Sequence, residues 1–241
     1  MLDLPNPEGG KRRRKWHTFK GTKRQAETEC ARLIAEMDGG SYIEPSKTTV
    51  REFFETWLKH EKANVSPKTH ARYEELLLKN VAPVIGATTL NKLTAAKIDG
   101  CWTKLLESGR RDGKGGLAPR TVGHCRRVML TAMEQALKWD LVKKNPVAVT
   151  RPPKTERPTM TAYGAAETAV MLEALRPTRM FVPAILAALC GLRRGEILAL
   201  RWRHVDLKNA VLSIVASAEQ VGTEVRYKET KSGKARTVAL S

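Results

Sequence analysis

Two arginines and a glutamate form a short segment whose residue types can bind an oxyanion. The stretch AALCGLRRGEILALRWRHVD, residues 187–206, has an apolar run that stops at Gly191, and Arg193, Arg194 and Glu196 follow. Gly191 stands where a helix C-cap takes the left-handed conformation, which would turn the next side chains back toward the fold. Glu196 can hold the guanidinium of Arg193, and the remaining N–H groups can then bind an oxyanion. A local Arg–Glu pair at an ordinary helix–turn–helix joint is the alternative.

A lysine is predicted at the tip of a β-hairpin further along the chain. Residues 210–216 are rich in Val, Ile and Leu and predict a strand, and residues 225–230 and 236–240 flank a turn at Ser232-Gly233. Lys231 would lie at this tip, 38 residues after Arg193. A lysine in such a place is usually only solvent-exposed, but its ammonium can also donate a proton to a leaving oxygen.

The charge of the chain favours a polyanionic partner. The 241 residues carry a formal net charge of +18, which points to nucleic acid ahead of a membrane surface. Residues 46–155 hold most of the excess, with 21 basic against 10 acidic residues. No stretch reaches the ~20 apolar residues of a membrane span, and no signal peptide is visible. The four cysteines lack zinc-ligand spacing and predict reduced core residues, and the glycines of residues 112–116 do not fit a nucleotide-phosphate loop. We therefore expect no metal, cofactor or nucleotide, and no membrane.

The N-terminal section combines a dense basic run with aromatic residues. Eight basic residues lie between Lys11 and Arg24, with Trp16, His17 and Phe19 among them. Glycines predict short strands and turns here, followed by a helix that Thr22 caps and that ends near Met37. Its expected inner face holds Ala26, Cys30, Leu33, Ile34 and Met37. The run is either a solvated tail or a surface that docks on nucleic acid, and its interleaved aromatics favour docking. The basic and aromatic residues assigned to DNA are Lys11, Arg12, Arg13, Arg14, Lys15 and Trp16.

The next section predicts a compact domain of four helices. Val50, Phe53, Phe54, Trp57 and Leu58 recur at helical spacing. A second helix begins at Ser66-Pro67, and Pro83 and Gly86 end it. A third helix follows Thr94, and a fourth runs from about Pro119 to Trp139. Several basic side chains lie near helix starts or on outer faces. They either face solvent only or bind DNA phosphates. The residues assigned to DNA here are Lys68, Arg72, Arg120, His124 and Arg127.

A proline-rich strap separates this section from the arginine segment. Residues 145–158 contain four prolines, which block a helix and favour an extended linker. Helices are then predicted over residues 165–175 and 180–190. A short helix from Glu196 would turn Ile197, Ala199 and Leu200 inward, with Trp202 packed at its end.

Together these segments resemble the tyrosine recombinases, specifically the phage-type integrases. CGLRRGEILALRWRHVDL is similar to the family's first catalytic-arginine segment, and YKETKSGKARTVALS to its catalytic-lysine hairpin. By this resemblance Arg193 is the first active-site arginine, Glu196 its supporting acid and Lys231 the general acid. VAPVIGATTLNKLT and KKNPV resemble the core-type DNA-binding domain, and GKRRRKWHTFKGTKRQAE the arm-type domain.

The resemblance implies a mainly α fold with small β elements. Its expected parts are an N-terminal small β-sheet plus helix at residues 1–45, a SAM-like four-helix core-binding domain at 46–145, a linker at 146–158 and an incomplete α+β integrase catalytic domain at 159–241. The implied partner is double-stranded DNA at attachment sites, on which the protein self-associates. The implied location is the cytoplasm of a bacterial host, associated with the nucleoid.

The activity that the resemblance implies is DNA integration, by cutting and rejoining strands without metal or cofactor. A tyrosine attacks the scissile phosphate, which gives a 3′-phosphotyrosine and frees a 5′-hydroxyl. The family places a His-x-x-Arg segment and this tyrosine after the lysine hairpin, whereas the sequence given stops at Ser241. We expect from this a fragment or truncated reading frame of an integrase from a phage or other mobile element, inactive alone. The alternative is an inactive DNA-binding remnant that competes for attachment sites.

Overall fold

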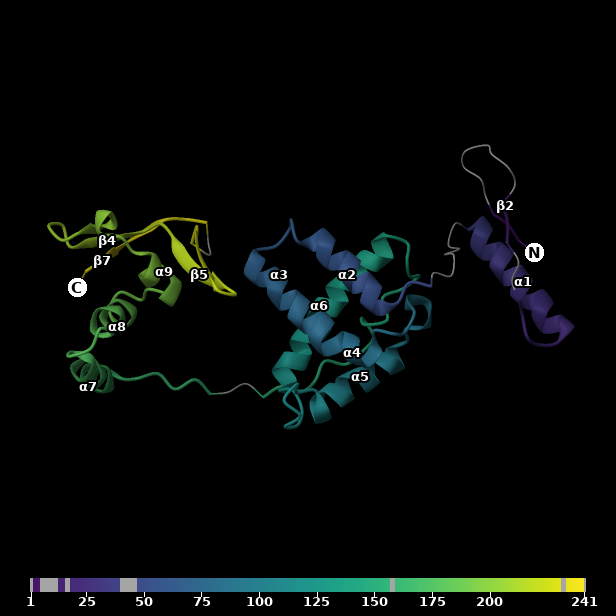
Figure 1. Ribbon diagram of the computed structural model, residues 1–241, viewed down its shortest axis with the longest axis horizontal. Helices are drawn as coiled ribbons and strands as arrows, with labels where there is room; N and C mark the ends of the chain where they lie inside the picture. The colour runs from purple at the N-terminus through teal and green to yellow at the C-terminus, as the bar shows by residue number, and fades with distance from the viewer. Residues whose placement is uncertain are drawn as a thin grey trace. The chain divides into compact units, whose positions relative to one another are not determined.

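The computed structural model describes residues 2–4, 13–15, 18–39, 47–156, 159–230 and 233–240. Contacts divide the chain into two compact units, residues 1–64 with 72–155 and residues 65–71 with 156–241. Figure 1 shows the helices α2 to α6, and the shorter helices α7 to α9 with the small strands of the second unit. Within the described ranges, no helix is both long and apolar enough to cross a lipid bilayer.

The N-terminal segment forms a strand pair and one helix. Strand β1 (Leu2–Leu4) pairs antiparallel with β2 (Arg13–Lys15), which confirms the short strands. Helix α1 (Lys23–Asp38) begins at Thr22, whose Oγ1 accepts from the Gln25 amide while the Gln25 side chain accepts from the Thr22 amide. The predicted apolar face is wrong in part, because Cys30 is exposed and Ile34 is 46% exposed. Spacing along a helix shows which residues share a face but not whether another element covers it.

Four helical stretches enclose the main core, as the apolar spacing predicts. They are α2 (Val50–Glu61), a continuous run of α3 (Pro67–Glu74), π-helix η1 (Glu75–Val81) and α4 (Ala82–Ile85), then α5 (Ala95–Ser108) and α6 (Pro119–Lys138). The 3-10 turn η2 (Leu90–Lys92) joins α4 to α5. The apolar face of α2 is buried as predicted, and Trp57 stacks on Tyr73 with ring centroids 5.6 Å apart. The predicted end of the second helix at Pro83 and Gly86 agrees with the structure, because α4 ends at Ile85 and Gly86 is its C-cap residue.

The second unit places short helices beside two small antiparallel sheets. Its helices are α7 (Ala165–Leu175), α8 (Phe181–Ala188), α9 (Arg194–Ala199) and the 3-10 turn η3 (Trp202–His204). The strands β3 (Val205–Asp206), β4 (Val211–Ile214) and β7 (Arg236–Ala239) form one sheet in the order β3-β4-β7. Strands β5 (Ser217–Val221) and β6 (Glu224–Lys228) form the other. Leu192, Leu212 and Ile214 make the buried centre of this unit.

Strand pairing in this unit differs from the predicted hairpin. Strand β7 pairs with β4 and β6 pairs with β5, so β6 and β7 are not the two arms of one hairpin. The sequence SAEQV of β5 has no alternation of apolar and polar residues, and the strand was therefore absent from the prediction. Gly222, with φ +60°, makes the tight turn between β5 and β6.

Candidate functional site

The arginine segment forms the predicted reversal after α8. Gly191 has a φ of +63°, the left-handed conformation expected of a helix-ending glycine. The amide of Leu192 donates to the carbonyl of Leu186 at 3.2 Å, and the Leu192 side chain is buried in the centre of the unit. Arg193 follows in extended conformation as the N-cap residue of α9. The buried Leu192 therefore fixes the backbone from which the guanidinium of Arg193 projects.

A buried carboxylate holds Arg193 by two hydrogen bonds. The Arg193 backbone amide donates to Glu196 Oε2 at 3.0 Å, and Arg193 Nη1 donates to Glu196 Oε1 at 2.9 Å. The Glu196 side chain is 1% exposed, whereas that of Arg193 is 63% exposed. Among the described residues, none accepts a hydrogen bond from Nε or Nη2 of Arg193. The predicted Arg–Glu pair is thus present, and it leaves N–H groups of the guanidinium open to solvent.

A second arginine, which the sequence analysis missed, completes the pairing of Glu196. Arg236, the first residue of β7, donates from Nη1 to Oε1 at 2.9 Å and from Nη2 to Oε2 at 2.7 Å. The hydrogen bonds from Arg236, with smaller contributions from Arg193, lower the pKa of Glu196 to about 2, although burial acts to raise it. The alternation of side chains along β7 is the signal that could have predicted this contact. Arg236 lies two residues before Val238 and therefore on the same, inward face of the strand.

Gly195 brings α9 against strand β5. A Cβ at this position would lie 2.4 Å from Ser217 Oγ and 2.6 Å from the carbonyl oxygen of Ala218. Glycine between Arg194 and Glu196 is therefore required by close packing, and Figure 1 shows α9 beside β5. The arginine turn is held from one side by this contact and from the other by the burial of Leu192.

Lys231 lies outside the described residues, but its neighbours on both sides are described. Thr230 is 5% exposed, and its Oγ1 donates to the carbonyl of Lys234 at 2.7 Å. The amide of Gly233 donates to the Thr230 carbonyl at 2.9 Å, and Gly233 has a φ of +67°. These two hydrogen bonds join Thr230 to Gly233 and Lys234, which are described residues on either side of Lys231 in the sequence. Its role as a general acid stays a prediction.

Basic residues of the helical unit gather around His124. Arg120, His124 and Arg127 recur at helical spacing along α6, and Arg72 comes from α3. Burial lowers the pKa of His124, and the positive charges of Arg127, Arg72 and Arg120 lower it further. Arg72 pairs with Glu75 at 2.5 Å, whereas no described carboxylate lies within ion-pair distance of Arg120 or Arg127. The predicted cluster is therefore three neighbouring arginines with a histidine among them; we call Arg72, Arg120, His124 and Arg127 the basic cluster.

The other predicted DNA-binding residues have separate places. Lys68 is exposed one helical turn before Arg72 on α3. Arg13, Arg14 and Lys15 form β2, while Lys11, Arg12 and Trp16 lie outside the described residues. Arg126, which was not among the residues assigned to DNA, makes a structural contact. Its guanidinium donates to Thr150 Oγ1 at 3.0 Å and to the Thr150 carbonyl at 2.8 Å. It anchors the loop after α6.

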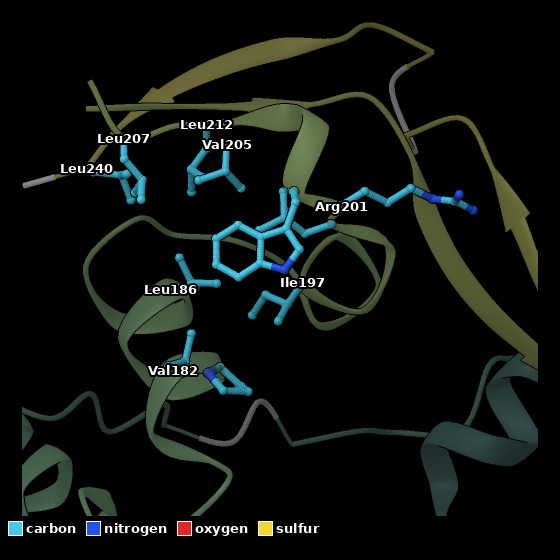
Figure 2. A pocket seen from close by; sticks show the side chains of 11 residues that line it. Val182, Leu186, Ile197, Arg201, Val205, Leu207, Leu212 and Leu240 are labelled. Atoms are coloured by element: carbon cyan, nitrogen blue, oxygen red, sulfur yellow. The ribbon is translucent and has the colours of Figure 1, made fainter. Parts of the chain in front are cut away.

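An apolar groove of about 420 Å³ opens in the second unit (Figure 2). Leu186, Ile197 and Leu212 line it with Trp202, which is 82% exposed. The predicted packing of Trp202 at the end of α9 is therefore wrong; the indole stands at the groove because α9 ends before it and η3 redirects the chain. In Figure 2, Arg201 extends away from the apolar side chains, and its guanidinium lies 5.4 Å from the ring centroid of Tyr227.

The helical unit matches a known protein family. Residues 49–106 match the family described as "Phage integrase, N-terminal SAM-like domain". The matched residues run from the cap of α2 into α5 of the helical unit, so this part of the chain is similar to the SAM-like domain of phage integrases.

Two bacterial integrases are similar in sequence over most of the chain. The integrase of Saccharopolyspora erythraea is 24% identical over 85% of this chain and 46% of its own length. The integrase of Streptomyces ambofaciens is 28% identical over 78% of this chain and 47% of its own length. The chain spans about half the length of these curated relatives.

A solved structure shares the fold. The crystal structure of a lambda integrase tetramer bound to a Holliday junction is similar with a TM-score of 0.61 and 18% identity, over 97% of this chain and 64% of that chain. The mainly helical architecture with small C-terminal antiparallel sheets is thereby confirmed as integrase-like.

Proposed function

We propose that the chain belongs to a site-specific recombinase that integrates DNA, and that Arg193 binds the scissile phosphate. The observation that carries this proposal is the pairing of Arg193 with a buried Glu196, which fixes the guanidinium while leaving N–H groups exposed. A phosphodiester oxygen is the acceptor that matches such a group, because a planar guanidinium binds phosphate with directed hydrogen bonds. The high positive charge of the chain and its likeness to integrases support the same substrate.

The chemistry assigned to this site is electrostatic stabilisation and proton transfer. Arg193 neutralises charge that grows on the nonbridging oxygens as a tyrosine attacks the phosphate, a contribution of ~3 kcal/mol for one preorganised donor. Lys231 donates a proton to the leaving 5′-oxygen, and the bond broken in the DNA is replaced by a 3′-phosphotyrosine. The reverse attack by a 5′-hydroxyl rejoins the strand and restores the tyrosine. Glu196 takes no part in proton transfer, since a pKa of about 2 keeps it ionised.

The DNA contacts are assigned to the basic cluster, Lys68 and the arm residues Lys11 to Trp16. Arg120 and Arg127 have no described carboxylate partner, so phosphates can complete their pairing without breaking an ion pair. Strand exchange needs more than one protomer, and the lambda relative is a tetramer on its junction. We therefore include double-stranded attachment-site DNA and further copies of the protein as partners.

The proposal is tested first by binding to duplex DNA at several salt concentrations. The double variant Arg120→Ala/Arg127→Ala should lower the slope of log affinity against log salt by about one unit for each lost phosphate contact. Arg226→Ala is the control for a lost positive charge, because its guanidinium is already paired with Glu224 at 2.7 Å. Equal slopes in all the proteins would remove the basic cluster from the DNA interface.

The second test looks for strand cleavage. The purified chain is incubated with nicked duplexes selected for binding, and covalent protein–DNA adducts are sought on denaturing gels. An adduct that disappears in Arg193→Ala supports cleavage at the proposed site. Such an adduct would overturn the alternative, a DNA-binding protein that occupies attachment sites without cutting them, whereas binding with no adduct is expected both of that protein and of a fragment that is inactive alone.

A further inference from the structure

One buried carboxylate joins two segments that are far apart in sequence. Each oxygen of Glu196 accepts one hydrogen bond from Arg193 and one from Arg236, at 2.7 to 3.0 Å. A carboxylate that is 1% exposed and accepts four hydrogen bonds has no freedom to rotate without losing some of them. The position of the Arg193 side chain therefore depends on a residue of β7.

Arg236 is itself fixed by the sheet. It is the first residue of β7 and lies opposite Ile214 of β4, which is 2% exposed in the centre of the unit. Lys231 precedes Arg236 by five residues in the sequence, and Thr230 Oγ1 donates to the carbonyl of Lys234 at 2.7 Å. The ion pair between Arg236 and Glu196 therefore links β7, the strand after Lys231, to the first turn of α9, where Arg193 is the cap.

We propose that Arg236 is a positioning residue that holds Glu196, so that Arg193 presents its open N–H groups to a phosphate. This role rests on the proposed function, since phosphate binding by Arg193 is part of that function. Both Nη atoms of Arg236 donate to Glu196, so the role assigned to Arg236 acts through that carboxylate.

The test follows the Nε–H signal of Arg193 by NMR in the full chain with labelled arginine, assigned with Arg193→Lys. Inorganic phosphate is the probe. In the wild-type protein the Arg193 signal should shift on titration. In Arg236→Ala the phosphate affinity read from this signal should fall about tenfold, the effect of losing roughly 1.4 kcal/mol. Arg236→Lys should recover part of the loss, because an ammonium keeps the charge but not the bidentate geometry. Arg226→Ala, which removes a surface arginine paired with Glu224, should behave as wild type.

Failure of the positioning role and failure of the proposed function give different results. Wild-type affinity in both Arg236 variants would overturn the positioning role. No response of wild-type Arg193 to phosphate would instead contradict the proposed function. The role of Arg236 is then measured without ligand, from faster hydrogen exchange at the Arg193 backbone amide, which donates to Glu196, and from a raised pKa of the Glu196 carboxyl in Arg236→Ala; unchanged values overturn it. If Arg236→Ala unfolds the second unit, the phosphate affinity, the hydrogen exchange and the Glu196 pKa are measured in Arg236→Lys instead. Values equal to those of the wild type in that variant would overturn the positioning role.

Discussion

Arg236 and Glu196 form a bidentate ion pair, with N–O distances of 2.9 and 2.7 Å, although they lie 40 positions apart in the sequence. The pair connects β7 to the first turn of α9, and Arg193 shares the same carboxylate. Because Glu196 is buried and its partners are half-exposed or exposed, the pair contributes both to the stability of the second unit and to the placement of Arg193.

The stability of the second unit should depend on the ionisation of Glu196. Its pKa is lowered from an ordinary 4.5 to about 2 in the folded protein, so the carboxylate stabilises the fold above pH 4.5 and this contribution is lost as the pH falls toward 2. With discount for the exposure of Arg193, we expect a contribution of about 2 kcal/mol at neutral pH.

Glu196→Gln tests this dependence by urea unfolding at several pH values. The free energy of unfolding of the variant should be about 2 kcal/mol lower at pH 7. It should also fall less between pH 4.5 and pH 2 than that of the wild type, because glutamine does not titrate. An acid limb identical to that of the wild type would show that Glu196 is not the group that titrates.

Gly195 should tolerate no side chain. Gly195→Ala places a Cβ within 2.6 Å of two atoms of β5, one of them a backbone oxygen, and should destabilise the second unit by about 1–3 kcal/mol. Gly100→Ala is the matched control, because Gly100 lies within α5 and its added Cβ meets nothing within 4 Å. Alanine at position 100 should stabilise the helical unit by up to about 1 kcal/mol. Thermal unfolding measures both, and equal effects would contradict the packing argument.

DNA binding should strengthen as the pH falls through the pKa of His124. In the free protein that pKa is lowered by burial and by Arg127, Arg72 and Arg120, so the imidazole is neutral at pH 7. Phosphates placed over the basic cluster favour the charged form, and binding then takes up a proton. Anisotropy titrations across pH should show this slope in the wild type and a smaller one in His124→Asn. The same slope in both proteins would place His124 away from the bound phosphates.

The arm residues should contribute to salt-dependent affinity. Replacing Arg12, Arg13 and Arg14 together with Ala should weaken binding to arm-type sites and reduce the salt slope by about one unit for each lost phosphate contact. The measurement is a salt titration of wild type and variant on one duplex. An unchanged slope would show that this run is a solvated tail.

Local periodicity was enough to predict the helical elements. The apolar residues of α2 repeat at the helix period and are all buried, because they form one wide apolar face that packs on the neighbouring helices. They are Val50, Phe53, Phe54, Trp57 and Leu58. The cap at Thr22 is predictable for the same local reason, since its side chain accepts from the amide three residues later.

Contacts between distant segments were beyond reach of the sequence pattern. Gly191 and the Arg193–Glu196 pair are local and were predicted, but Arg236 reaches Glu196 only because β7 joins β4. Strand β5 has no apolar alternation of its own, so its pairing with β6 and its contact with Gly195 were not anticipated. Exposure of Trp202 and Cys30 depends on what covers them, which spacing does not encode.

Whether Arg193 and Lys231 bind the same phosphate can be seen in a crystal structure of the chain bound to a nicked duplex. We expect both residues to donate hydrogen bonds to the phosphate at the nick, with Glu196 still holding Arg193. Contacts from these two residues to different phosphates, or a Lys231 side chain directed away from the one that Arg193 binds, would contradict this expectation.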